Sequence, residues 1–113
     1  MARTDDEVID ELRSIYHEEF AGKANQRFLI SWADLRSLYG FGRLENSRFE
    51  RLATRAYDRG AYLFDLGEGE SGHMVAVVTR KTVDRWRKVP RNVIRRHHPP
   101  PDTDTADFEG GEE

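Results

Sequence analysis

Three short motifs, each typical of a helix start, divide the first 60 residues of this 113-residue chain. In a capping box, a Ser or Thr side chain accepts a hydrogen bond from the amide three residues later, and an acidic residue there bonds back. The chain carries this pattern at Thr4–Glu7, Ser31–Asp34 and Ser47–Glu50. The motifs predict helices over residues 5–20, about 32–39 and 47–59, with Asn46 as an alternative cap for the third.

Apolar spacing predicts that one side of the first helix is buried. The apolar residues recur every three or four positions, at Val8, Ile9, Leu12, Ile15, Tyr16 and Phe20. Gly22 is expected to stop this helix. Gly40 and Gly42 break the chain after the second helix, and Phe41 between them is expected to fill the core. Gly60 suits the left-handed position that often ends a helix, here the third.

Three apolar segments outside the helices are predicted to be strands, at residues 27–30, 61–66 and 73–79. The last two form a hairpin, and its glycine-rich connection over residues 67–72 is predicted to be a loop of about six residues. A short helix over residues 82–89 is predicted next, ended by Pro90. Its apolar face carries Val83, Trp86 and Val89, and Trp86 is expected to pack on the core.

The net charge of −3 conceals a strong partition along the chain. Residues 1–20 carry 2 basic and 7 acidic side chains, residues 21–100 carry 16 and 8, and residues 101–113 carry none and 6. The basic middle suits a polyanion, and the two acidic ends oppose it. The expected organisation is a folded domain over 1–90, a basic and Pro-rich linker over 91–101, and a disordered acidic tail over 102–113.

Four arginines share one side of the predicted third helix: Arg48, Arg51, Arg55 and Arg59. On a helical wheel they span an arc of roughly 60°. Such a stripe can bind phosphate oxygens or guanine edges through the guanidinium fork. It can also be a solvated helix face balanced by acids such as Glu45, Glu50 and Asp58.

The order helix, strand, helix, turn, helix and hairpin over residues 5–80 resembles the winged helix-turn-helix family. Ser31, Leu35 with Leu38, the turn at 40–42 and Gly60 stand where that family has a cap, a leucine-bearing helix, a turn and the start of the wing. The resemblance implies an α+β fold with a three-helix core, a short strand and a C-terminal β-hairpin wing. A short helix and a disordered acidic tail would follow.

The resemblance also implies sequence-specific binding of double-stranded DNA by a small transcriptional regulator, with the third helix in the major groove. Carried onto this sequence, Asn46, Arg48, Arg51 and Arg55 would face DNA, and Arg59 would lie nearer a phosphate. In many members of the family the first helix also packs against a second subunit. A homodimer through that helix is therefore expected.

A second basic segment follows the hairpin and contains Arg80, Lys81, Arg85, Arg87, Lys88, Arg91, Arg95 and Arg96. It is suited to supporting contacts with phosphates, of which Arg80, Lys81 and Arg85 are the candidates nearest the domain. It is also consistent with a solubilising helix. The acidic tail can be a solubilising end, can fold back to compete with nucleic acid, or can offer Phe108 to a protein partner.

Other classes of function lack their signatures. There is no cysteine, hence no disulfide or thiolate metal site, and the four histidines do not have metal-site spacing. No nucleophile elbow or phosphate-binding loop is present, so neither enzymatic activity nor a cofactor is expected. No apolar run approaches the ~18 residues of a membrane span, and no signal-peptide pattern is seen. A cytoplasmic protein without membrane contact is expected.

The alternative is a non-enzymatic protein-interaction module with a winged-helix fold, such as a phage or mobile-element inhibitor that binds a host protein. In that case the arginine stripe grips an acidic partner, or the acidic ends mimic nucleic acid. A continuous positive face across the third helix would favour DNA. A dominant negative face would favour the alternative.

Overall fold

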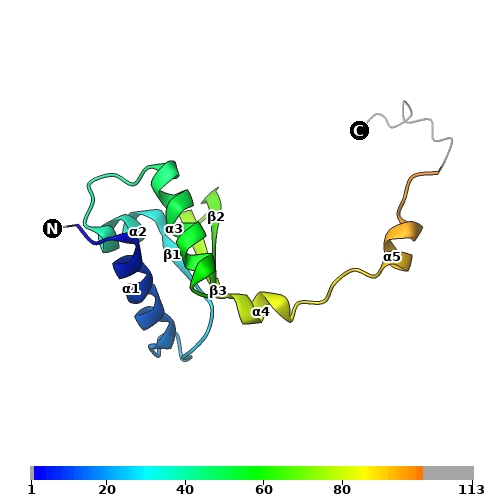
Figure 1. The fold of residues 1–113 in the computed structure, drawn as a ribbon, viewed down its shortest axis with the longest axis horizontal. Helices are drawn as coiled ribbons and strands as arrows, with labels where there is room; N and C mark the ends of the chain where they lie inside the picture. Colours follow the sequence, from blue (N-terminus) through cyan, green and yellow to red (C-terminus); the bar gives the residue numbers. More distant parts are fainter. Residues whose placement is uncertain (1, 101–113) are drawn as a thin grey trace.

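The computed structural model describes residues 2–100, and within them it contains five helices and a three-stranded antiparallel sheet (Figure 1). In chain order the elements are α1 (Asp5–His17), β1 (Phe28–Ser31), α2 (Trp32–Tyr39), α3 (Asn46–Asp58), β2 (Ala61–Gly69), β3 (Gly72–Thr79), α4 (Arg80–Asp84) and α5 (Arg91–Arg96). The architecture is therefore α+β, as predicted. The expected tail over 102–113 lies outside the described residues.

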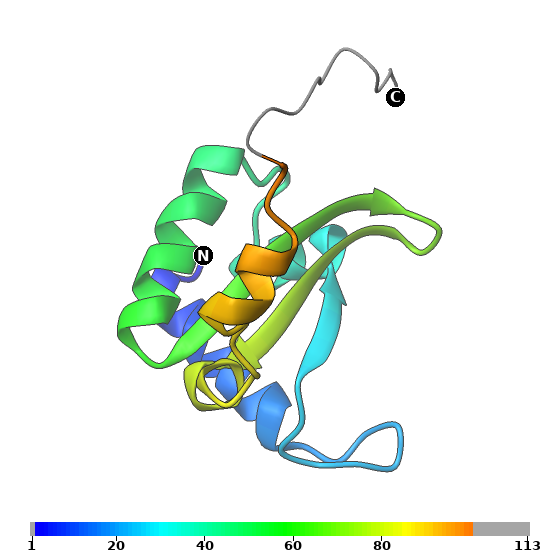
Figure 2. The same ribbon diagram turned by 90° about the vertical axis from the view of Figure 1, so that its right-hand side faces the viewer.

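The strand β3 lies at the centre of the sheet, in the order β1-β3-β2. Phe28 of β1 and Leu63 of β2 both pair with Val77, and all three side chains are buried. This inward side of the sheet shares one apolar core with α1, α2 and α3. Figure 2 shows the β2–β3 hairpin reaching beyond the helices.

The capping box at the start of α1 is confirmed in both directions. The amide of Glu7 donates to Thr4 Oγ1 at 3.2 Å, and the amide of Thr4 donates to Glu7 Oε1 at 2.8 Å. The helix ends at His17 rather than at residue 20, because Glu18 is already extended. The following loop closes this end, where the amide of Asn25 donates to the carbonyl of Tyr16.

The predicted capping box at Ser47 is wrong. The helix α3 begins at Asn46, its N-cap is Glu45, and that cap makes no side-chain hydrogen bond. Leu44 and Phe49 flank this start and are both buried in the same core. Such a hydrophobic staple fixes where the chain enters the helix and takes the place of a polar cap.

The predicted six-residue hairpin loop is also wrong. The strands continue to a pair between Gly69 and Gly72, so only two residues form the turn. The strand β2 accommodates the glycine-rich segment through a register shift between Asp65 and Gly67, where Gly67 has φ +70°. A bulge of this kind uses the left-handed freedom of glycine and lets the ladder continue.

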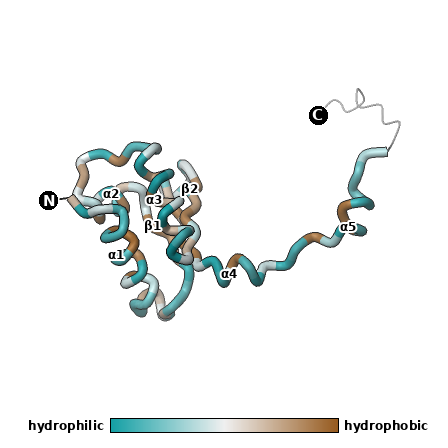
Figure 3. The backbone as a smooth tube through the Cα atoms, in the orientation of Figure 1, coloured by the Kyte–Doolittle hydropathy of each residue, from teal (hydrophilic) through white to brown (hydrophobic). Residues whose placement is uncertain are grey.

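Beyond the sheet, α4 and α5 lie on a basic arm that leaves the domain (Figure 1). The helix α4 covers residues 80–84 rather than 82–89, because the Thr79 side chain caps it by accepting from the amide of Thr82. Trp86 and Val89 are exposed rather than packed on the core. Without burial, a longer helix here lacks tertiary support. Figure 3 shows the arm as largely hydrophilic with isolated apolar positions.

Candidate nucleic-acid interface

The helix α3 carries the arginine stripe and is held by its opposite face. Phe49, Leu52 and Ala56 are buried, and they fix the rotation of the helix about its axis. With those residues inward, the positions at 47, 50, 51, 54 and 58 lie farthest from the core and are all exposed. Arg51 is one of these positions, whereas Arg48, Arg55 and Arg59 lie on the flank of α3 that faces α1.

Three of these arginines are paired with the acidic side of α1, and two of the three, Arg55 and Arg59, make exposed pairs. Arg55 Nε donates to Asp6 Oδ1 at 2.9 Å. Arg59 donates through Nη2 to Asp10 Oδ1 at 2.6 Å, and its Nη1 lies 3.4 Å from Asp6 Oδ1. The Arg55 and Asp6 side chains are 50% and 53% exposed, so water and ions reach this pair. Exposed pairs of this kind contribute little to stability and exchange partners readily.

Arg48 has a different role, because its partner also serves a buried side chain. Tyr39 is fully buried and donates its hydroxyl to Asp5 Oδ1 at 2.5 Å. Arg48 Nε donates to the same oxygen at 3.0 Å, and its guanidinium lies over the rings of Tyr39 and Phe41. Burial and the hydrogen bond to Asp5 raise the pKa of Tyr39 above its ordinary value. Arg48 is therefore part of the structure that joins α1, α2 and α3.

The carboxylate of Asp6 is held in its charged form. The hydrogen bond from Arg55 lowers its pKa below the ordinary value, the nearby charges of Arg55 and Arg59 act in the same direction, and partial desolvation opposes them. Asp6 therefore presents an ionised carboxylate to α3 at neutral pH. The stripe is therefore balanced chiefly between two helices, and Asp58 of α3 acts on Arg55 only through its nearby charge.

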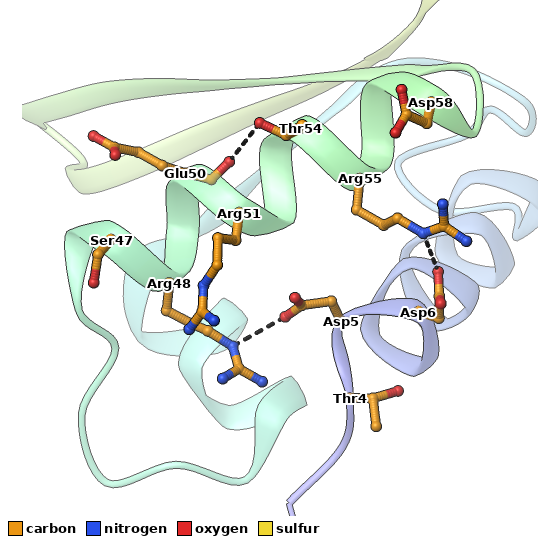
Figure 4. Close-up of a pocket in the computed structure, with 10 residues that line it drawn as sticks. All are labelled: Thr4, Asp5, Asp6, Ser47, Arg48, Glu50, Arg51, Thr54, Arg55 and Asp58. Atoms are coloured by element: carbon orange, nitrogen blue, oxygen red, sulfur yellow. Dashed lines mark hydrogen bonds and ion pairs between the residues drawn. The ribbon is translucent and has the colours of Figure 1, made fainter.

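Arg51 is the member of the stripe that stays free. Among the described residues it has no ion-pair or hydrogen-bond partner, and it is exposed. It borders an open hollow of about 890 Å³ between the start of α1 and the outward side of α3. Figure 4 shows Arg51 extending toward the side where Arg48 meets Asp5, while Ser47 and Thr54 border the same hollow. Asn46, the first residue of α3, is also exposed.

The basic segment after the sheet begins with a fixed arginine. Arg80 donates to the carbonyl of Tyr57 at 3.2 Å, and its guanidinium lies 4.2 Å from the centre of that ring. Lys81 and Arg85 are exposed, and neither forms an ion pair within residues 2–100. The structure therefore brings Arg80 against the end of α3 and leaves Lys81 and Arg85 on the arm.

Sequence reasoning missed a polar cluster near the turn of the β2–β3 hairpin. His73 Nε2 lies 2.6 Å from Asp65 Oδ1, and the His73 ring stacks on Trp32 with 4.3 Å between ring centres. Partial burial raises the pKa of Asp65, but hydrogen bonds from the Gly67 amide and from His73 outweigh it, and the net shift is downward. The alternation along β3 could have indicated that His73 shares a face with Val75.

Within residues 2–100, no group of three or more His, Cys, Asp or Glu side chains is placed to hold a metal ion. None of the helices in that part of the chain combines the length and apolar character needed to cross a membrane. Comparisons with protein-family models, curated proteins and solved structures found no match. Function is therefore inferred from the geometry of the chain itself.

Proposed function

We propose that this chain is a winged helix-turn-helix domain that binds double-stranded DNA and acts as a transcriptional regulator. The element order supports the fold, since α2 and α3 are joined by a short turn and followed by a hairpin. The sheet order β1-β3-β2 also supports it, because the strand between the first two helices pairs with the second strand of the hairpin. In this arrangement α3 enters the major groove.

The observation that carries the proposal is the unpaired Arg51 on the outward side of α3. Ser47 and Thr54 lie on the same exposed surface, where the Thr54 hydroxyl donates to the carbonyl of Glu50 and the Ser47 hydroxyl and the Arg51 guanidinium are open to a ligand. Arginine donates two parallel hydrogen bonds to guanine, and hydroxyl groups bond bases or phosphates. We infer that Arg51 reads a base edge and that its neighbours help to orient the helix.

Arg55 and Arg59 supply phosphate contacts in this proposal by exchanging partners. Their present partners, Asp6 and Asp10, are more than half exposed, and a phosphate carries at least the same charge as a carboxylate. Arg48 stays with Asp5, because leaving it would strip the buried Tyr39 hydroxyl of one polar neighbour. Lys81 and Arg85 add contacts from the arm.

The test is fluorescence anisotropy of a labelled duplex, titrated with the full chain at several salt concentrations. We expect affinity to fall log-linearly with salt, by a slope of about 0.9 for each phosphate contact. Arg51→Glu should abolish binding without unfolding the domain. Arg13→Glu is the matched control, because Arg13 is exposed on α1 and changes charge equally. Retained binding by Arg51→Glu would remove α3 from the proposal.

One observation favours the protein-interaction module as a second candidate. Three of the four stripe arginines are neutralised by α1, so the face over α1 and α3 is mixed in charge rather than continuously positive. The wing tip is acidic, with Glu68 and Glu70. Absence of duplex binding by the full chain at low salt, with an intact fold, would favour this candidate, and a pull-down for a protein partner would follow.

A further inference from the structure

The domain has a groove at the place where the basic arm begins. The second halves of α1 and α3 meet the start of β2 and the end of β3 there, around a hollow of about 660 Å³. The floor of the groove is apolar, and its lining includes Leu12, Tyr16, Leu63 and Val78. A volume of this size is typical of ligand sites in proteins, so the groove has room for an aromatic side chain and its neighbours.

The rim of this groove is basic. Arg13, Arg59, Arg80 and Lys81 line it, together with one acid, Asp84. Arg59 is already balanced by carboxylates of α1, and Arg80 is held at the end of α3. Arg13 and Lys81 are exposed and have no ion-pair partner within residues 2–100. A matching occupant therefore combines an apolar group with negative charge.

Residues 101–113 of the same chain, which lie outside the described residues, have this combination. They contain six acidic side chains, no basic ones and one aromatic residue, Phe108. Asp107 and Glu109 flank Phe108 directly, so a buried ring would have a carboxylate on either side. Charge and apolar character thus occur together in this segment in the same way as they do around the groove.

The chain between the groove and Phe108 is long enough to return to the groove. Asp84 lies at the edge of the groove, and an extended residue spans up to about 3.6 Å against about 1.5 Å in a helix. In Figure 1 the arm leads away from the domain, so docking requires the arm to fold back. Residues 85–90 and 97–100 belong to no helix or strand, and α5 between them has no buried residue. Folding back therefore disrupts no core packing.

We propose that the segment around Phe108 docks into this groove of its own chain. The ring of Phe108 packs on the apolar floor, and the neighbouring carboxylates pair with Arg13 and Lys81. The tether keeps the segment at a high effective concentration, so a weak contact is enough to fill the groove. The arm also offers positive charge, but α5 has no buried residue and provides no apolar floor for the ring.

Docking regulates the DNA contacts proposed above, and this consequence rests on that proposed function, whereas docking itself does not. Arg59 and Lys81 line the groove, and both are proposed to bind phosphates. Carboxylates held beside them compete with DNA, so the docked segment inhibits binding. Arg13→Glu loosens the docked segment and removes no DNA contact, so that variant should bind a duplex at least as tightly as the native chain.

The first test detects docking in the full chain without DNA. Since the sequence has no cysteine, Gly111→Cys provides a single site for a nitroxide label close to Phe108. We expect the label to weaken the amide NMR signals of groove residues such as Tyr16 and Val78, relative to the same chain with the label reduced. Adding Phe108→Ala should restore those signals, because the ring no longer anchors the segment.

Charge reversal on the rim provides a matched pair of variants for the same measurement. Arg13→Glu should restore the groove signals, because it places a carboxylate beside the acidic segment. Arg27→Glu is the control, because Arg27 is also exposed but does not line the groove. Circular dichroism should show the same melting transition for both variants. Equal restoration by both would mean that net charge alone holds the segment, and would overturn docking in the groove.

Other results would also overturn the proposal. Undiminished groove signals would show that the segment does not dock, and signal loss confined to the arm would place it on the arm. A mixture of nitroxide-labelled chain with isotope-labelled chain detects docking into a second copy. Signal loss in that mixture would overturn the intramolecular contact and support the homodimer expected through α1, whose second half lines the groove.

Anisotropy of a labelled duplex then tests the regulation. Phe108→Ala should bind the duplex more tightly than the native chain, most clearly at low salt, where charge competition is strongest. Thr105→Ala is the control in the same segment, because it truncates a side chain and leaves the ring. Equal affinity of Phe108→Ala and the native chain would overturn the inhibition. Absence of duplex binding by every variant would overturn the proposed function, whereas the NMR result decides docking on its own.

Discussion

The molecule has two arginine-rich regions that look alike in the sequence and differ in the structure. On α3, Arg48, Arg55 and Arg59 are paired with carboxylates of α1. On the arm after β3, the described residues form no ion pair, and most side chains are exposed. The number of arginines in a segment therefore does not determine their availability. What determines it is whether another element places carboxylates within reach.

The α1–α3 contacts also divide into a structural part and an exchangeable part. Asp5 is 26% exposed and serves Tyr39 as well as Arg48, whereas Asp10 is 61% exposed and serves Arg59. We expect Asp5→Ala to lower the free energy of unfolding by about 2–3 kcal/mol, because it leaves a buried hydroxyl unpaired. Asp10→Ala should change it by less than about 1 kcal/mol. Urea denaturation measures both, and equal losses would contradict the division.

Removing the carboxylate partners of Arg55 and Arg59 should make these two arginines as available to DNA as the unpaired basic residues on the described part of the arm. In Asp6→Asn with Asp10→Asn, the guanidinium groups of Arg55 and Arg59 no longer face carboxylates. Since Arg55 and Arg59 no longer give up carboxylate partners when they bind phosphates, duplex affinity should rise at each salt concentration, with the salt slope little changed. The control is Glu18→Gln with Glu19→Gln, which removes the same charge just beyond α1. An equal effect in both variants would mean that only net charge matters.

The arm should respond only through electrostatics. Lys81→Gln with Arg85→Gln is expected to reduce the salt slope by about 2, because two phosphates lose their basic partners. The free energy of unfolding should not change, because α4 has no buried residue. Anisotropy titrations and urea denaturation of the same variant check both statements. A loss of stability would show that the arm packs on the domain.

Acid should weaken the β2–β3 hairpin and the α1–α3 contacts in the same pH range. The pKa values of Asp6 and Asp65 are lowered in the folded chain from the ordinary value of 3.8, so the folded state holds their protons less tightly than the unfolded state does. Their stabilisation is complete above that value and is lost as the pH falls below it. Asp65→Asn should show a smaller decline in stability between about pH 5 and pH 2. An unchanged decline would exclude Asp65 as a contributor.

Local patterns predicted the elements well where the information is local. The bounds of α2 follow from the Ser31 cap and the left-handed Gly40, both within a few residues of the helix ends. The start of α3 was misplaced, because the staple between Leu44 and Phe49 depends on a core that includes other elements. The hairpin loop was overestimated, because glycines in a bulge and glycines in a loop look the same in a sequence.

The pairing of the arginine stripe could not be predicted from periodicity. A helical wheel gives the angles between Arg48, Arg51 and Arg55, but it does not say which flank another helix covers. The carboxylates that pair with the stripe lie 43 to 53 positions earlier in the chain. Only the tertiary arrangement of α1 against α3 assigns Arg51 to the open side and its neighbours to the paired side.

The long separation between these partners has a consequence for synthesis on the ribosome. The capping box lets α1 form from its own residues soon after they emerge. At that stage its carboxylates repel one another, and Val8, Ile9 and Leu12 have nothing to pack on. Both problems last until residues 48–59 have emerged, several seconds later at elongation rates of roughly 5–20 residues per second. Through that interval the apolar side of α1 has no core to enter and stays exposed to solvent.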